Sequence, residues 1–130
     1  MRTPSEALLY TGIKPARAHD TDAGYDLASA VHATIPPGDF TTVSLGFGMV
    51  VPDGHAGMVV SRSGLASKHG IAILNSPGII DAGYRGDVKA ILMNHGSETF
   101  HIAPGDRIAQ LLLVPVTHPR WERVDVLPAG

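Results

Sequence analysis

Residues 75–87 carry the clearest group of side chains suited to chemistry. Asp81 follows two isoleucines, and Tyr84 and Arg85 stand between two glycines. This order predicts a β-hairpin with a polar pocket between its arms. A carboxylate at the end of an apolar strand is desolvated and suited to act as a general base that orients a water, and the Tyr84 ring can pack against a sugar. The equally weighted alternative is a turn in which Asp81 only accepts hydrogen bonds from backbone N–H groups.

The segment around Arg62 is suited to bind an anion. It ends an apolar strand and opens a short helix, which we expect over Ser63 to His69, with Ser63 as its N-cap and Gly70 at its end. Free N–H groups at a helix start, the planar cation of Arg62 and the close approach that Gly64 permits would together hold an oxyanion. An ordinary serine cap followed by a surface arginine explains the segment equally well.

Three carboxylates, Asp20, Asp22 and Asp26, lie beside a tight turn at Gly24. Magnesium binds such carboxylates, usually one or two of them, and retains several waters. A solvated turn with side-chain hydrogen bonds to the backbone is the more frequent structure for such a cluster. Taken alone, the cluster is a weak indication of a metal site.

A single amide, Gln110, lies in the apolar run that begins at Arg107. A buried amide needs hydrogen-bond partners, so Gln110 either bonds neighbouring backbone or faces a ligand. The first is the more frequent case in proteins.

Several kinds of catalytic centre are excluded. The chain has no cysteine, which excludes disulfides, thiolate metal sites and a cysteine nucleophile. Its seven histidines are scattered, without the i, i+2 or i, i+4 pairs of a metal site. Neither a G-x-S-x-G elbow nor a G-x-x-x-x-G-K-S/T phosphate loop occurs. Chemistry by an activated water remains.

Short strands must position these residues. Fifteen glycines and ten prolines interrupt the chain, and no segment keeps the apolar spacing of a long helix. This rhythm predicts an all-β sandwich, jelly roll or barrel. The apolar runs between the interruptions are 42–51, 57–61, 88–94 and 107–116.

The length predicts one domain. With 130 residues, 44% of them hydrophobic, the chain is long enough for one core and too short for two, so we expect a single domain over residues 1–130. Residues 117–130 contain two prolines and the tryptophan, and we expect them to form a C-terminal arm that leaves the barrel. Arms of that kind often cross to a neighbouring subunit.

The charge balance limits the partners. Ten Lys and Arg residues against twelve Asp and Glu leave a net charge of −2, so no global basic field would bind a nucleic-acid backbone. No apolar run approaches the ~20 residues of a membrane helix, and residues 1–10 lack the pattern of a signal peptide. We expect a cytoplasmic protein with no membrane and no direct nucleic-acid partner.

Four segments, taken in order, resemble the first four of the five motifs of the dUTPase family. The resemblance extends from about Ala18 to about Val116, and four ordered matches with similar spacing are very specific. The matching segments are AGYDLAS (23–29), RSGLA (62–66), GIIDAGYRGD (78–87) and GDRIAQ (105–110).

The resemblance implies a jelly-roll-like distorted β-barrel of the dUTPase-like or β-clip class, assembled as a homotrimer with active sites at the subunit interfaces. It implies an enzyme that hydrolyses dUTP to dUMP and pyrophosphate with Mg²⁺ as cofactor, which limits uracil in DNA and supplies dUMP for dTMP synthesis. In this mechanism a water attacks the α-phosphorus in line while Mg²⁺ orients the phosphates.

The matched motifs also imply site residues. Asp26 would position the magnesium through water, Asp81 would orient the attacking water and touch the 3′-hydroxyl, and the Tyr84 ring would lie where a 2′-hydroxyl would clash. Asn75 and the backbone of the hairpin would contact the uracil edge. Arg62, Ser63 and Gln110 would contact the triphosphate. The other substrate contacts would be Gly64, Ile80 and Lys89.

The chain departs from the family pattern at two places. Ser61 stands where the family normally has proline, which changes details only. The fifth motif, a Gly-rich tail with an arginine and usually an aromatic residue, would follow Ala129, whereas the sequence stops at Gly130. From this we expect nucleotide binding with weakened catalysis, because water exclusion and one phosphate-binding cation would be lost.

Two alternative functions share this fold. A dCTP deaminase shares this fold but needs a catalytic glutamate on the strand after Asp81, and residues 88–93 contain no carboxylate. Zinc deaminases need cysteine ligands, which the chain lacks. A nucleotide-binding regulatory protein without a lid is the second alternative. The presence of Asp81, Arg62, Ser63 and Gln110 argues against it, because a pure binder has less need of a carboxylate that orients water.

Overall fold

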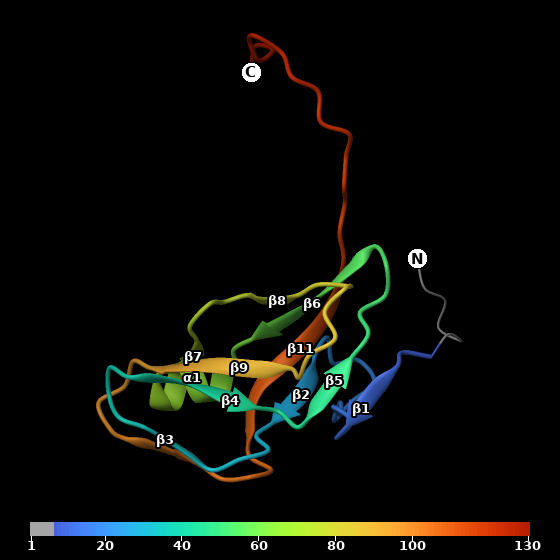
Figure 1. Ribbon diagram of the computed structural model, residues 1–130. Helices are drawn as coiled ribbons and strands as arrows, with labels where there is room; N and C mark the ends of the chain where they lie inside the picture. Colours follow the sequence, from blue (N-terminus) through green and yellow to red (C-terminus); the bar gives the residue numbers. More distant parts are fainter. Residues whose placement is uncertain (1–6) are drawn as a thin grey trace.

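The computed structural model describes residues 7–130 as short antiparallel strands with one helix (Figure 1). The fold expected from the sequence, all-β with a single short helix, is confirmed for this part of the chain. The elements in chain order are β1 (Tyr10–Gly12), β2 (Tyr25–Ala28), β3 (Ala33–Ile35), β4 (Phe40–Ser44), β5 (Phe47–Met49), β6 (His55–Val60), α1 (Ser63–His69), β7 (Ile71–Ile73), β8 (Gly78–Ile80), β9 (Lys89–Asn94), β10 (Phe100–Ile102) and β11 (Arg107–Pro115).

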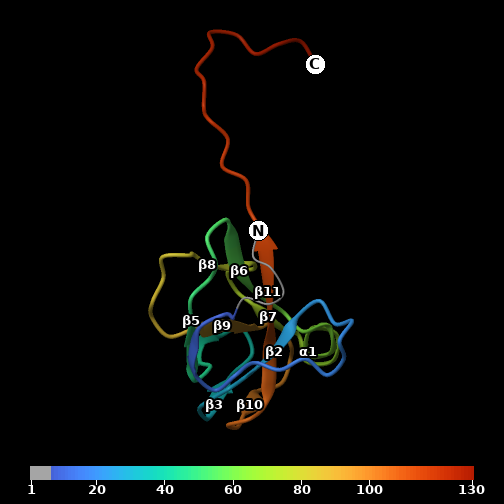
Figure 2. The same ribbon diagram turned by 90° about the vertical axis from the view of Figure 1, so that its right-hand side faces the viewer.

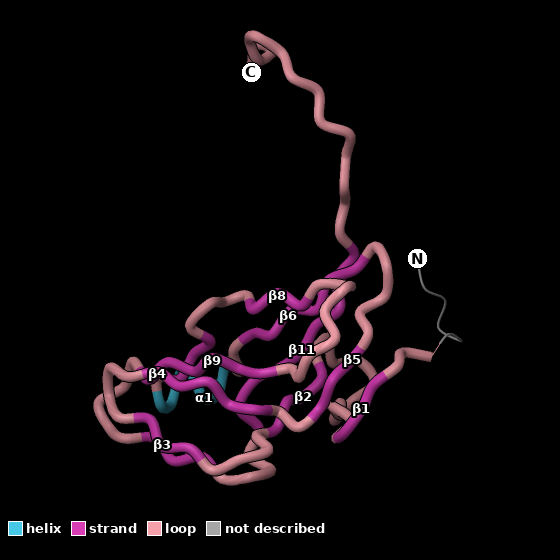
Figure 3. The backbone as a smooth tube through the Cα atoms, viewed as in Figure 1, coloured by secondary structure: helices cyan, strands magenta, loops and turns pink. Residues whose placement is uncertain are grey.

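Two larger sheets organise the body. One has the strand order β2-β11-β6-β8 and the other β4-β9-β7, and the remaining strands form the pairs β1-β5 and β10-β3. Figure 3 shows these strands enclosing a common interior, and the views in Figures 1 and 2 place α1 and β5 on opposite sides of the body. Strands from distant parts of the sequence are neighbours, so the position of each site residue depends on long-range pairing.

Alternating side chains from both larger sheets fill one core. Along β9, Ala90, Leu92 and Asn94 are buried while the residues between them are more exposed. Leu27 and Leu111 contribute from the other sheet to the same hydrophobic cluster. This period of two is the pattern of strands with one buried face.

The apolar run 42–51 does not form one strand. It divides into β4, which pairs with β9, and β5, which pairs with β1. Gly46 lies between them with a φ of 70°, a left-handed conformation that glycine adopts without strain and that turns the chain from one sheet to the other. The runs 57–61, 88–94 and 107–116 correspond to β6, β9 and β11.

Helix α1 has the predicted range but a different N-cap. Arg62 is the N-cap, with extended backbone, and no side chain caps the helix, so the expectation that Ser63 caps it is wrong. Ser63 is the first helical residue, one position too late for a capping side chain. Gly70 ends the helix as expected, with a φ of 69°. No helix among residues 7–130 is long and apolar enough to cross a membrane.

Residues 117–130 leave the body as an extended segment without helix or strand (Figures 1 and 2). Their apolar side chains are not covered by the rest of the chain: Trp121 is 91% exposed, and Val126 and Leu127 are each 81% exposed. Apolar side chains left open in this way are suited to contact another surface.

Candidate active site

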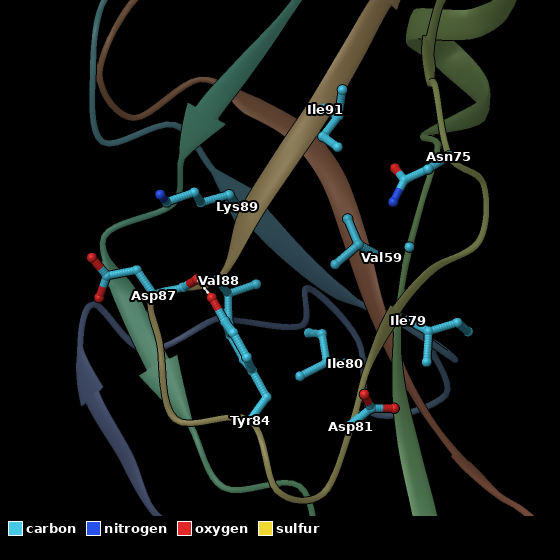
Figure 4. A pocket seen from close by; sticks show the side chains of 11 residues that line it. Val59, Asn75, Ile79, Ile80, Asp81, Tyr84, Asp87, Val88, Lys89 and Ile91 are labelled. Carbon is cyan, nitrogen blue, oxygen red and sulfur yellow. Dashed lines mark hydrogen bonds between the residues drawn. The ribbon is translucent and has the colours of Figure 1, made fainter.

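A cavity of about 190 Å³ lies where the chain passes from β8 to β9. The predicted site residues that line it are Asn75, Ile80, Asp81, Tyr84 and Lys89. In the view of Figure 4, Asn75 and Lys89 stand on opposite sides of the cavity, and the other three lie along one edge. The apolar part of the wall comes from Ile80 and neighbouring aliphatic residues. A concave, mainly apolar surface with a few polar groups is typical of a small-molecule site.

The two arms of the segment 75–87 are not paired as a hairpin. The pocket expected between them exists, but β8 pairs with β6 and β9 pairs with both β4 and β7. β4 runs along one edge of β9, β7 covers the other edge only from Leu92 to Asn94, and β8 pairs with β6 instead of the rest of that edge. The cavity is therefore a gap between two sheets, and the turn 81–87 joins them.

Hydrogen bonds within that turn hold Tyr84. Its backbone N–H donates to the Asp81 carbonyl at 3.0 Å, and its hydroxyl donates to the Asp87 carbonyl at 2.7 Å. Arg85 donates to the Ala82 carbonyl at 2.7 Å. Asp81 itself is exposed, so its own chain does not desolvate it as the sequence suggested.

A second group of predicted residues gathers around Asp26 on β2. The Asp26 carboxylate lies 3.7 Å from Arg62 Nε and 3.6 Å from Arg107 Nη1, and its side chain is 27% exposed. Arg62 also donates to the Arg107 carbonyl at 3.1 Å. One partly buried carboxylate is thus held between two cations, an arrangement that can accept further anionic oxygens.

Gln110 belongs to this second group. It pairs with Asp26 on one side and with Val60 on the other, and its Nε2 donates to the Ser61 carbonyl at 2.9 Å. The Ser61 hydroxyl, which stands at the family's proline position, accepts the Ile73 N–H at 2.9 Å. Gln110 therefore bonds backbone, as amides most often do, while it lies beside the charged side chains.

Ser63 and Gly64 complete the group at the start of α1. The first intrahelical donor is the Ala66 N–H, which bonds the Arg62 carbonyl at 3.1 Å. The preceding N–H groups have no acceptor within the helix, as at any helix start. A Cβ at Gly64 would have no atom within 4 Å, so the space beside it is open.

The three carboxylates near Gly24 do not converge. Asp22 accepts the His19 N–H at 3.0 Å, and Arg17 donates to the Asp20 carbonyl at 2.8 Å. No group of three or more His, Cys, Asp or Glu side chains suited to a metal occurs among residues 7–130. Only Asp26 of the three lies beside the two arginines.

The sequence does not predict a role for Arg107. In a regular strand, residues three apart point to opposite faces, so the sequence separates Arg107 from Gln110. The pairing of β11 with β2 shifts register between Arg107 and Ala109. This irregularity breaks the alternation, and the Arg107 side chain reaches Asp26. No signal in the sequence marks the shift.

Strand β6 separates Asp81 from Arg62. Ile80 pairs with Gly57, whereas Arg62 follows the far end of the same strand. The step from Gly57 to Arg62 along the extended chain is roughly 16 Å, at about 3.3 Å per residue. Asp81 lies one residue beyond Ile80, so a single chain does not bring it to Arg62.

The comparisons with known proteins agree on one family. The family model described as dUTPase matches residues 11–129. The deoxyuridine 5′-triphosphate nucleotidohydrolase of Tropheryma whipplei (strain Twist) is 49% identical over 126 residues, which cover 96% of this chain and 86% of that protein. The protein of the same description from Gloeobacter violaceus is 43% identical over 132 residues and covers 100% and 90%.

Solved structures show the same fold. The dUTPase of Staphylococcus bacteriophage 80alpha with dUPNHPP has a TM-score of 0.88 at 27% identity, covering 96% of this chain and 92% of that one. A mutant dUTPase from phage phi11 of S. aureus, in which a structural Mg(II) ion is coordinated, has a TM-score of 0.86 at 28% identity and covers 93% and 98%. The expected all-β, jelly-roll-like architecture is confirmed by these similarities.

Proposed function

The chain belongs to the dUTPase family, and from that premise we propose how its residues carry out the reaction of the family. It is an enzyme that hydrolyses dUTP to dUMP and pyrophosphate. The observation that carries the residue assignments is the division into a cavity with a carboxylate at its edge and a separate group of cations and N–H donors. The cavity suits the nucleoside part of dUTP, and the group of cations and N–H donors suits its triphosphate.

The cavity between β8 and β9 binds the deoxyuridine. Its mainly aliphatic wall with a few polar groups suits a base and a sugar. Asn75 and the backbone of β8 beside Ile80 contact the uracil edge, and the Tyr84 ring faces the deoxyribose. Lys89 adds a cation at the cavity wall, on the side from which the phosphates extend.

The group around Asp26 binds the triphosphate. Arg62 and Gln110 contact phosphate oxygens, and the N–H groups of Ser63 and Gly64 donate to them. Arg107 joins them as a further cation. The open space beside Gly64 supports close approach of a phosphate.

Asp26 suits magnesium that arrives with the nucleotide. Magnesium in nucleotide sites is usually held by one or two carboxylates together with substrate phosphates and waters, and Asp26 supplies one carboxylate beside the proposed phosphate contacts. The absence of a three-carboxylate group among residues 7–130 favours this mode over a site made only of protein ligands. When bound, the metal orients the phosphates and neutralises their charge.

The two surfaces combine between subunits of a homotrimer. Roughly 16 Å of extended chain lies between Gly57, which pairs with the residue before Asp81, and Arg62, so we place the Asp81 end of the cavity of one subunit against the Asp26 group of the next. The uncovered apolar side chains of residues 117–130 support an arm that crosses to a neighbour. We take residues 1–130 as one domain whose last part is this arm. A cytoplasmic location fits the absence of cysteine.

Asp81 is the catalytic residue in this proposal. Its carboxylate accepts a proton of the attacking water and aligns the oxygen with the α-phosphorus. The new P–O bond forms as the bond to the bridging oxygen breaks, and pyrophosphate leaves. The neighbouring subunit supplies the desolvation that its own chain does not. Strand β9, which follows, carries no carboxylate for deamination.

Pyrophosphate release tests the assignment. We expect release from dUTP, far less from dCTP or dTTP, and strong inhibition when Mg²⁺ is chelated. The Asp81→Ala variant should still bind dUTP, because its cavity and cations remain, but should lose turnover. Full turnover by this variant would show that Asp81 is not the catalytic residue. Equal rates on all three nucleotides would show that the cavity does not select the uracil base.

A further inference from the structure

Tyr84 is held at two points although its side chain is not buried. The residue is 43% exposed, so packing alone does not fix its ring. Its N–H is bonded to the Asp81 carbonyl at 3.0 Å, and its hydroxyl is bonded to the Asp87 carbonyl at 2.7 Å. The backbone of the turn 81–87 therefore closes around the ring and sets its orientation at the cavity wall.

Gly86 makes the hydroxyl contact possible. A Cβ at this position would lie 2.5 Å from Tyr84 Oη, 2.7 Å from Cζ and 3.1 Å from Cε1. The φ of Gly86 is not in the left-handed region, so the backbone does not require glycine there. Glycine is needed at this position because any side chain would collide with the Tyr84 ring.

Gly83 provides the matched comparison. It belongs to the same turn, its φ is also outside the left-handed region, and a Cβ there would have nothing within 4 Å. A methyl group can thus be added at two glycines of one turn, and only the one at Gly86 collides with Tyr84.

We propose that Gly86 is a positioning residue that sets the selection against ribonucleotides. Its missing side chain lets the Tyr84 hydroxyl reach the Asp87 carbonyl, which fixes the ring at the place that a 2′-hydroxyl would occupy. A ring free to rotate would yield to the extra hydroxyl, whereas a fixed ring excludes it by shape. This inference rests on the proposed function, in which Tyr84 faces the deoxyribose.

The readout is the ratio of kcat/KM for dUTP to kcat/KM for UTP. Rejection of an added hydroxyl by shape is typically on the order of a hundredfold, and Gly86→Ala should lower the ratio by about tenfold. Tyr84→Phe keeps the ring and removes one neutral hydrogen bond, so it should lower the ratio by about two- to tenfold. Gly83→Ala should leave the ratio unchanged.

The outcomes separate the inference from its premise. If Gly86→Ala lowers both kcat/KM values equally, or if Tyr84→Phe keeps the wild-type ratio, the inference is wrong. Tyr84→Phe decides the matter if Gly86→Ala does not fold. A Tyr84→Ala variant tests the premise: if it keeps the wild-type ratio, Tyr84 does not face the sugar. If Tyr84→Ala lowers the ratio while Gly86→Ala keeps the wild-type ratio, Tyr84 faces the sugar but Gly86 is not a positioning residue.

Discussion

Gln110 and Asp26 lie directly opposite each other across β11 and β2. The Asp26 carboxylate lies 3.7 Å from Arg62 Nε. Gln110 donates to the carbonyl of Ser61, the residue before Arg62. The register of three adjacent strands therefore fixes the groups that we assign to the triphosphate. A substitution that disturbs this register or its side-chain contacts should weaken catalysis without affecting the nucleoside cavity.

Gly24 provides space for the Gln110 amide. A Cβ at Gly24 would lie 2.6 Å from Gln110 Oε1, so Gly24→Ala should displace the amide and leave the Ser61 carbonyl without its donor. A lost bond of this kind costs about 1–3 kcal/mol, and we expect kcat/KM for dUTP to fall about tenfold or more. Steady-state pyrophosphate release measures this. An equal fall in Gly83→Ala would show that the effect does not pass through Gln110.

Arg107 should contribute to binding of phosphates only. Removing its cation in Arg107→Ala should raise KM for dUTP by about tenfold or more, the range of a charge-assisted hydrogen bond. Inhibition by deoxyuridine, which has no phosphate, should not change. Arg107→Lys should recover part of the loss because it keeps the charge. Weaker deoxyuridine binding in Arg107→Ala would place Arg107 at the nucleoside instead.

Asp26 should determine the response to magnesium. Asp26→Asn keeps the size of the side chain but removes the charge between Arg62 and Arg107. We expect the Mg²⁺ concentration for half-maximal turnover to rise about tenfold, because the protein loses the carboxylate that positions the metal through water. Asp22→Asn is the control, since Asp22 bonds the His19 N–H and lies outside this group. The same Mg²⁺ titration for Asp26→Asn and the native enzyme would exclude this role.

Asn94 should contribute to stability rather than to catalysis. Its side chain is fully buried, donates to the Ile35 and Glu98 carbonyls, and accepts the Gly96 N–H. Asn94→Ala leaves these groups without partners, so the free energy of unfolding should fall by about 3 kcal/mol. Urea unfolding measures the change, with the exposed Lys68→Ala as control. A loss below about 1 kcal/mol would show that water replaces the side chain.

Local patterns were sufficient for much of the fold. Glycine and proline spacing predicted short strands, and Gly70 correctly marked the end of α1, because such signals act within a few residues. The predicted N-cap was Ser63 and the observed one is Arg62, because the cap position depends on the backbone conformation of a single residue. The division of 42–51 at Gly46 depends on which sheet each half joins, and the sequence of that run does not show this.

Long-range pairing explains what the sequence could not give. The motifs named nearly all proposed site residues, but nothing in them indicates that Ile80 pairs with Gly57 while Arg62 lies at the other end of β6. Arg107 was missed because a register shift in β11 carries its side chain to Asp26. The division of the site into two surfaces is thus a property of strand register.

Mixed trimers of two inactive variants test whether these surfaces meet between subunits. Asp81→Ala and Arg62→Ala are coexpressed with different affinity tags, and trimers carrying both tags are purified. Each variant alone should lose turnover of dUTP. In a cyclic trimer with both kinds of subunit, one interface combines an intact Asp81 with an intact Arg62, so turnover per trimer should return to about a third of the native value. Mixed trimers as inactive as their parents would show that each site is built within one chain, because every subunit then keeps a lesion.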